Sequence, residues 1–143
     1  MDVQDAVKTY TAKAESFYGD GRTAEFFERL KRREFATLKC GACGNVMFPP
    51  RPFCPQCHSD AVFWIEMPRT GTLYGFTTQE KAFRFSNPAV LGLVELEGIG
   101  RIITKIDAPF ETLRIGMRVE LEFLELEDGS VVHQFKPVDA PAK

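Results

Sequence analysis

The sequence contains no apolar run long enough to cross a membrane, which needs about 18 or more consecutive apolar residues. Its first residues, MDVQDAVKTYTAKAESF, carry acidic groups early and lack the apolar segment of a secretory signal. The net charge of −2 provides no general attraction to nucleic acid or to anionic membranes. These absences predict a cytoplasmic protein. Thiols stay reduced there, so paired cysteines indicate metal or redox chemistry rather than disulfides.

The sequence also lacks the common catalytic motifs, including G-x-S-x-G, the Walker loop, G-x-G-x-x-G and H-E-x-x-H. It has two histidines, and we expect the second, His133, on one face of an edge strand. The acidic residues spaced along 120–127 are typical of a solvated strand face rather than of a paired acid and base. We therefore predict that the chain is not an enzyme by itself.

All cysteines of the chain fall in LKCGACGNVMFPPRPFCPQC, residues 38–57, as two C-x-x-C pairs: Cys40, Cys43, Cys54 and Cys57. A tetrahedral metal held by thiolates needs its ligands in pairs from tight turns, and this spacing provides them. Gly44 relieves the first turn and Pro55 stiffens the second. The pattern predicts a zinc ribbon. Iron in a rubredoxin-like site is the alternative, because the same thiolates hold it.

A site saturated by four thiolates keeps no open position for water or substrate. The metal is therefore expected to be structural, with metal-coupled folding free energy on the order of 10 kcal/mol. His58 directly follows the last cysteine and is expected to be a bystander rather than a ligand.

The segments on either side of the cysteines differ in hydrophobic period. Residues 2–18 place apolar groups on one helical face, and GDGR at 19–22 ends that pattern. A second helix is predicted over residues 24–35, with Thr23 as its N-cap and Phe26, Phe27 and Leu30 buried.

After the cysteines the sequence pattern is typical of β-strands. They are predicted over residues 62–67, 71–78, 89–98, 101–106, 118–127 and 131–138. Short turns at 97–100 and 128–130 join neighbouring strands, and the adjacent apolar pair Phe123 and Leu124 predicts a β-bulge. Five to six short strands in about seventy residues indicate a small closed or partly closed barrel.

The order of a helical arm, KCGACGNVMFPPRPFCPQC, GTLYGFTT and AVLGLVELEGIGRIITKI…LRIGMRVELEF resembles the zinc-ribbon/OB-fold accessory proteins of thiolases and hydroxymethylglutaryl-CoA synthase-like enzymes. The resemblance spans nearly the whole chain. It implies an α+β protein with an N-terminal helical arm (1–36), a rubredoxin-like four-cysteine zinc ribbon (37–67) and a C-terminal OB-fold β-barrel (68–143). It carries over no catalytic residue, and it assigns one structural zinc ion per chain to Cys40, Cys43, Cys54 and Cys57.

The same resemblance implies a non-catalytic subunit of a hetero-oligomer, docked on a thiolase-like partner that performs the acyl transfer. The ribbon and barrel would stabilise that partner and help to form its acyl-CoA channel. Related proteins also accompany hydratases and aldolases, so the partner's reaction stays open. There are two alternatives, a nucleic-acid-binding ribbon–barrel module and a stand-alone acyl-CoA carrier. The nucleic-acid alternative is supported by four basic residues: Lys31, Arg32, Arg33 and Lys39.

Two features of the sequence favour a partner surface. The helical arm carries more aromatic side chains than two short helices need to cover a small barrel: Tyr10, Phe17, Tyr18, Phe26 and Phe27. The inter-strand segment EKAFRFSNPAV, residues 80–90, offers cationic and aromatic groups to a partner or to CoA phosphates: Lys81, Phe83, Arg84 and Phe85. Packing on the barrel is the alternative for the first set, and a plain surface loop is the alternative for the second.

Overall fold

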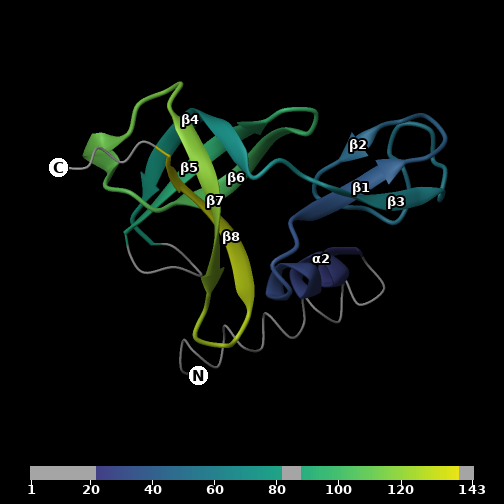
Figure 1. Ribbon diagram of the computed structural model, residues 1–143, viewed down its shortest axis with the longest axis horizontal. Coiled ribbons are helices and arrows are strands. Elements are labelled where there is room, and N and C mark those ends of the chain that lie inside the picture. The colour runs from purple at the N-terminus through teal and green to yellow at the C-terminus, as the bar shows by residue number, and fades with distance from the viewer. Residues whose placement is uncertain (1–21, 82–87, 139–143) are drawn as a thin grey trace.

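The computed structural model describes residues 22–81 and 88–138. The first predicted helix, with Tyr10, Phe17 and Tyr18, lies outside these residues, as do Phe83, Arg84 and Phe85. Within them, a helix, a three-stranded sheet and a closed barrel follow one another along the chain (Figure 1). The described part of the chain is therefore mostly β with one α-helix, and the predicted order of helix, ribbon and barrel is confirmed.

Helix α2 spans Arg22–Lys31 and directs Phe26 and Leu30 into the core, while Phe27 is half-buried. The helix begins before Thr23, so the predicted N-cap is wrong. It also ends earlier than the predicted residue 35. Arg33 adopts a left-handed backbone conformation, with φ of 63°, and its N–H bonds to the Leu30 carbonyl at 2.9 Å. This turn directs the chain into the first strand.

The ribbon sheet contains β1 (Ala36–Cys40), β2 (Val46–Met47) and β3 (Val62–Glu66), in the antiparallel order β2-β1-β3. The central strand, β1, was not predicted from the sequence. Its five residues, ATLKC, do alternate between apolar and polar, but the segment is short and leads directly into the first cysteine pair, and four of the five residues are buried. Helix α2 covers this sheet in part, and the Arg29 guanidinium lies 4.3 Å from the ring centre of Trp64 on β3.

The barrel strands are β4 (Thr70–Gln79), β5 (Ala89–Leu96), β6 (Gly100–Ile106), β7 (Arg118–Glu125) and β8 (Val131–Pro137), with the 3-10 helix η1 (Phe110–Thr112) between β6 and β7. Their order is β4-β5-β6-β8-β7, and pairing of β4 with β7 closes the barrel. Only the β6–β8 pair is parallel among the described strands. This closed five-stranded order is that of an OB-fold.

The prediction of a β-bulge at Phe123–Leu124 is wrong. Strands β7 and β8 pair without interruption from Val119↔Pro137 to Glu125↔Val131. Adjacent apolar residues are accommodated there because both faces of the hairpin are partly covered; the Arg33 and Arg69 guanidinium groups each lie 5.5 Å from the Phe123 ring centre. The irregularity instead lies between β4 and β5, where Tyr74 is the extra residue.

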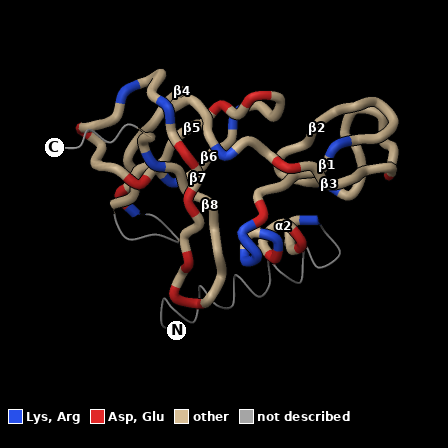
Figure 2. The backbone as a smooth tube through the Cα atoms, in the orientation of Figure 1, with Lys and Arg blue, Asp and Glu red and all other residues tan. Residues whose placement is uncertain are grey.

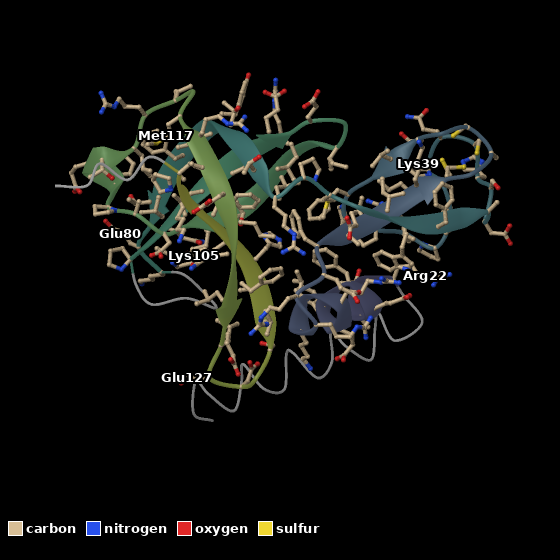
Figure 3. All side chains as sticks on the ribbon, viewed as in Figure 1. Arg22, Lys39, Glu80, Lys105, Met117 and Glu127 are labelled. Atoms are coloured by element: carbon tan, nitrogen blue, oxygen red, sulfur yellow. The ribbon has the colours of Figure 1, made fainter. Side chains whose placement is uncertain are left out.

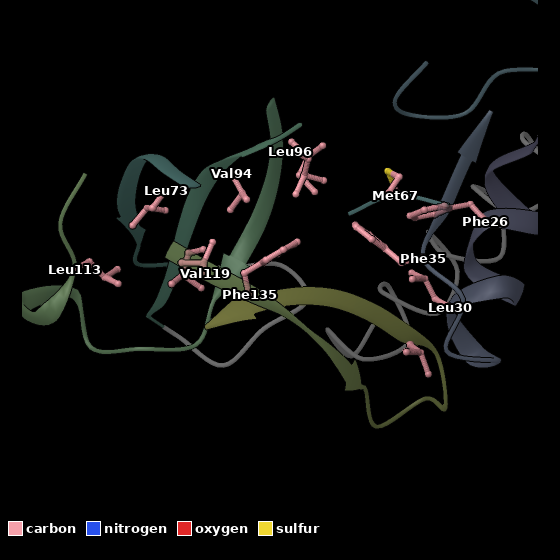
Figure 4. Close-up of a cluster of buried hydrophobic side chains, with 13 residues drawn as sticks. Phe26, Leu30, Phe35, Met67, Leu73, Val94, Leu96, Leu113, Val119 and Phe135 are labelled. Atoms are coloured by element: carbon pink, nitrogen blue, oxygen red, sulfur yellow. The ribbon is translucent and has the colours of Figure 1, made fainter. Parts of the chain in front are cut away.

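One continuous hydrophobic core joins the helix, the root of the ribbon and the barrel (Figure 4). Phe26 and Leu30 come from α2, Phe35 and Met67 come from the two chain segments that flank the ribbon, and Phe135 comes from the barrel. Because apolar burial is the main stabilising term in folding, this shared core couples the three parts energetically. The cysteine end of the ribbon projects away from the barrel (Figure 1).

Candidate metal centre

The sulfur atoms of Cys40, Cys43, Cys54 and Cys57 all lie within 4.8 Å of one another. Two pairs that bridge the knuckles, Cys40–Cys57 and Cys43–Cys54, are each 3.5 Å apart. A tetrahedral zinc ion with Zn–S distances of about 2.3 Å requires sulfurs about 3.8 Å apart, so this set fits one ion. The sulfurs gather at the outer end of the ribbon (Figure 3).

The two C-x-x-C turns repeat the same hydrogen-bond pattern. The amide of Gly44 donates to the Cys40 carbonyl at 3.0 Å, and the amide of His58 donates to the Cys54 carbonyl at 2.8 Å. In both turns the residue after the second cysteine adopts a left-handed backbone conformation, with φ of 80° at Gly44 and 64° at His58. His58 therefore occupies the position that Gly44 holds in the first turn. Its contribution is a backbone conformation, and it is not among the four metal-binding candidates.

The first cysteine of each turn is buried and receives backbone N–H groups. The amides of Cys43 and Ala42 point at the Cys40 sulfur, and that of Cys43 is the main cause that lowers the pKa of Cys40. Burial opposes ionisation of Cys54, but the N–H groups of Cys57 and Gln56 outweigh it and lower the pKa of Cys54 to about 6.

The second cysteine of each turn is exposed, and its pKa is raised instead of lowered. The Asn45 amide favours the Cys43 thiolate, yet the neighbouring Cys54 sulfur and burial raise the pKa of Cys43 to about 12. The pKa of Cys57 is also raised, by the Cys40 sulfur, against the effect of the Ser59 amide. Four thiolates this close repel one another, so a cation is required to hold all four deprotonated. A dication bound there has a complete set of sulfur ligands and no position for substrate.

The other residues singled out from the sequence do not gather at the metal. Phe26 is 4% exposed and packs in the core, where its ring centre lies 5.7 Å from that of Phe48. Phe27 lies against Phe26 with ring centres 5.4 Å apart and stays half-buried. Lys81 is exposed and lies shortly after β4, at the end of the described residues 22–81. Whether any of them meets a partner stays a prediction.

The junction of the three parts is a site that the sequence did not reveal. His133 on β8 is enclosed by the rings of Phe26, Phe35 and Phe48, with centres 5.9 to 6.2 Å from its own. Phe26 belongs to α2 and Phe48 follows β2, so helix, ribbon and barrel meet at one imidazole. Burial lowers the pKa of His133 to about 4. The sequence predicted His133 on an edge strand, but β8 lies between β6 and β7 in the closed barrel. A single histidine between Val132 and Gln134 does not identify the rings that surround it.

Lys and Arg residues are interspersed with Asp and Glu over the described barrel strands (Figure 2). Several of these charges are paired, as in the contact of Lys136 with Glu122 at 3.0 Å. A protein that tracks a phosphate backbone needs a basic stripe, and the barrel strands in residues 70–81 and 88–137 present none. Over the described residues, no helix is long and apolar enough to span a membrane.

A metal-binding four-cysteine ribbon followed by an OB-fold barrel defines the class of this chain. Residues 27–62 match the family model described as the ChsH2 rubredoxin-like zinc ribbon domain. Residues 64–124 match the model described as the ChsH2 C-terminal OB-fold domain. The chain belongs to this ChsH2 (DUF35) family of zinc-ribbon/OB-fold proteins, which confirms the resemblance predicted from the sequence.

Several relatives carry informative names. A DUF35 domain-containing scaffold protein of Methanocaldococcus jannaschii is 33% identical over 113 residues, covering 71% of this chain and 80% of the relative. Its counterpart in Methanothermobacter thermautotrophicus is 32% identical, covering 74% and 86%. A probable enoyl-CoA hydratase alpha subunit of Thermomonospora curvata is 33% identical over 118 residues, or 80% of this chain. The match spans only 37% of that protein's length.

Solved structures are similar as well, and two of them are informative. A chain of the Ltp2-ChsH2(DUF35) aldolase matches with a TM-score of 0.72 and 31% identity, covering 80% of this chain and 93% of that one. A DUF35-family protein of unknown function from Sulfolobus solfataricus matches with a TM-score of 0.56 and 17% identity, covering 91% and 96%. The second match supports the fold alone.

Proposed function

We propose that this chain is a non-catalytic accessory subunit of a thiolase-type acyl-CoA enzyme complex. The observation that carries the proposal is the match to nearly the full length of a chain from the Ltp2-ChsH2(DUF35) aldolase. Relatives named scaffold proteins support it. The metal site agrees with a scaffold role, because four sulfurs leave the ion no position for a substrate.

The chain would stabilise its catalytic partner and help to form the channel for acyl-CoA. Its working parts would be the helical arm (1–36), the zinc ribbon (37–67) and the barrel (68–143). Lys81 and the neighbouring Phe83, Arg84 and Phe85 would contact the partner or the CoA phosphates. Phe27 would contribute to the partner surface directly, whereas Phe26, already covered by the core, would act by packing. A cytoplasmic location would keep the metal-binding thiols reduced.

Co-expression with a thiolase-like protein encoded beside this chain tests the proposal. We expect the two to copurify, and we expect thioester turnover to require both. Turnover by this chain alone, or a partner that is fully stable and active without it, would contradict the proposal. The product formed by the reconstituted pair would identify the reaction as thiolase, synthase, hydratase or aldolase chemistry.

Two pairs of variants test the contacts. Lys81→Glu should raise the KM for acyl-CoA of the complex, whereas Lys31→Glu, on the exposed side of α2 and paired with Glu28 at 3.1 Å, should not. Phe27→Ser should weaken the complex more than the isolated chain. Phe26→Ser should weaken both equally, since Phe26 is 4% exposed in the chain itself.

A further inference from the structure

The outer side of the β5–β6 hairpin carries an apolar pair between charged residues, with one member exposed and the other half-buried. We call this the β5–β6 face and define it by its outward residues, which pair across the two strands as Glu95↔Arg101, Leu93↔Ile103 and Leu91↔Lys105. Ile103 is 68% exposed, and Tyr74, on the neighbouring strand β4, is 46% exposed. Leu93 and Leu91 are half-buried. An exposed apolar row with a charged border is typical of an interaction surface.

The ion pair between Glu95 and Arg101 on this face is long and exposed to solvent. The Arg101 Nε lies 3.9 Å from the Glu95 carboxylate, and the two side chains are 48% and 51% exposed. Such a long, solvent-exposed pair contributes little to stability. The Arg101 guanidinium is also stacked 3.6 Å from the ring centre of Tyr74, which holds it beside the apolar row. The Glu95 and Arg101 side chains are therefore accessible to a second protein.

Each cross-strand pair on this face joins two different side chains that attract or pack on each other. A two-fold axis running parallel to the strands, midway between β5 and β6, brings β5 of one copy over β6 of the other at the same level. It thereby places Leu93 on Ile103 and Glu95 opposite Arg101 across the interface, each contact occurring twice. Lys105 would present its aliphatic stem to Leu91, because its ammonium group is bonded to the Gln134 side chain at 3.1 Å.

We propose that the β5–β6 face is the interface of a two-fold symmetric homodimer of this chain. Charge complementarity favours a second copy of this chain over another occupant. The face carries one acidic and one basic group at the same level of the hairpin, and only a symmetric partner is obliged to present the opposite order. The proposal does not depend on the role proposed for the chain as an accessory subunit.

The oligomeric state of the zinc-loaded full chain provides the first test, by sedimentation velocity over a range of concentrations. We expect a dimer. We expect Ile103→Glu to weaken dimerisation by about tenfold or more, the loss of a central apolar contact corresponding to about 1.4 kcal/mol or more. The matched control is Ile115→Glu, because Ile115 is 72% exposed but lies outside this face, and it should leave the dimer intact.

Charge variants separate contacts between chains from contacts within one chain. Arg101→Glu leaves two acidic residues at positions 95 and 101, and Glu95→Arg leaves two basic residues there. In a symmetric dimer of either variant like charges would face each other, so each variant alone should be monomeric. Mixing the two should restore association as a heterodimer, although neither chain regains its internal ion pair. A mixture that stays monomeric would overturn the proposal, as would a wild-type chain that is monomeric at every concentration.

The same variants also test whether a catalytic partner, and not a second copy of the chain, binds to the β5–β6 face. If Ile103→Glu releases a copurified catalytic partner and leaves the self-association of the chain unchanged, the face belongs to that partner and the homodimer proposal is wrong. If Ile103→Glu abolishes the dimer while the partner still binds, both the homodimer and the accessory role stand. Folding of each variant is checked by circular dichroism as well as by zinc content, because the mutated strands belong to the barrel whereas the metal site lies on the ribbon.

Discussion

The hydroxyl oxygen of Thr104 on β6 lies 2.8 Å from Nδ1 of His133 on β8. The two strands are separated by much of the barrel sequence and run parallel, so this contact exists only once the barrel has closed. Together with the surrounding phenylalanine rings, it holds a neutral imidazole where helix, ribbon and barrel meet. Within residues 22–81 and 88–138, the imidazole contacts a hydroxyl group and phenylalanine rings and no carboxylate, so protonation there disfavours the folded state.

Acid should destabilise the protein through His133. Burial depresses its pKa from 6.5 to about 4, so the unfolded chain takes up the proton first as the pH falls. This residue leaves the free energy of unfolding unchanged above about pH 6.5 and decreases it between about pH 6.5 and 4, by an amount on the order of 3 kcal/mol. Urea unfolding of the zinc-loaded protein at several pH values measures the slope. His133→Gln should flatten it, and an unchanged slope in that variant would assign the effect to other groups.

Loss of one sulfur should collapse the ribbon. Cys54 is fully buried and its thiolate is supported by backbone N–H groups, so Cys54→Ser should abolish metal binding and remove metal-coupled stability on the order of 10 kcal/mol. Metal analysis and thermal unfolding measure both effects, with Ser59→Ala as the control in the same turn. The wild-type chain should contain one zinc ion, whereas an iron site would be visibly red. A Cys54→Ser chain that retains its metal and its melting temperature would disprove the assignment.

The two C-x-x-C turns should respond oppositely to changes after their second cysteine. His58 has φ of 64° and is not a glycine, so His58→Gly should relieve backbone strain and stabilise the ribbon by about 1 kcal/mol. Gly44 has φ of 80°, so Gly44→Ala should destabilise it by a similar amount, about 1 kcal/mol. Competition with a zinc chelator ranks the variants. Weaker zinc binding by His58→Gly would mean that the imidazole itself supports the metal.

Two glycines on the same strand, β4, should differ sharply. A Cβ at Gly71 would lie 2.7 Å from the Glu95 carbonyl oxygen and 2.7 Å from a Val94 methyl, and the backbone atom cannot move aside. Gly71→Ala should therefore cost about 1–3 kcal/mol, as overpacking does. At Gly75 a Cβ meets open space, so Gly75→Ala should change stability by about 0.5 kcal/mol or less. Chemical denaturation of both variants makes the comparison, and equal losses would argue against the close β4–β5 packing at Gly71.

Much of the architecture was predictable because it depends on residues close together in the chain. The turns at 97–100 and 128–130 contain glycines with positive φ, at Gly98, Gly100 and Gly129, and both form where expected. Strands β5, β6 and β8 lie within one or two residues of their predicted limits, because the glycine-containing turns mark where β5 ends and where β6 and β8 begin. The helix was placed correctly but not its ends, because the left-handed Arg33 that follows it carries no signal in the sequence.

The amino-acid sequence by itself determined the metal ligands, because two tight turns deliver each pair of sulfurs locally and the pairs are only a short segment apart. Only the tertiary structure decided that β1 is the centre of the ribbon, that the bulge lies at Tyr74 and that His133 is neutral. Each of these depends on which distant segments cover a residue. Burial by distant segments is a property of the closed fold, and the local order of residues does not encode it.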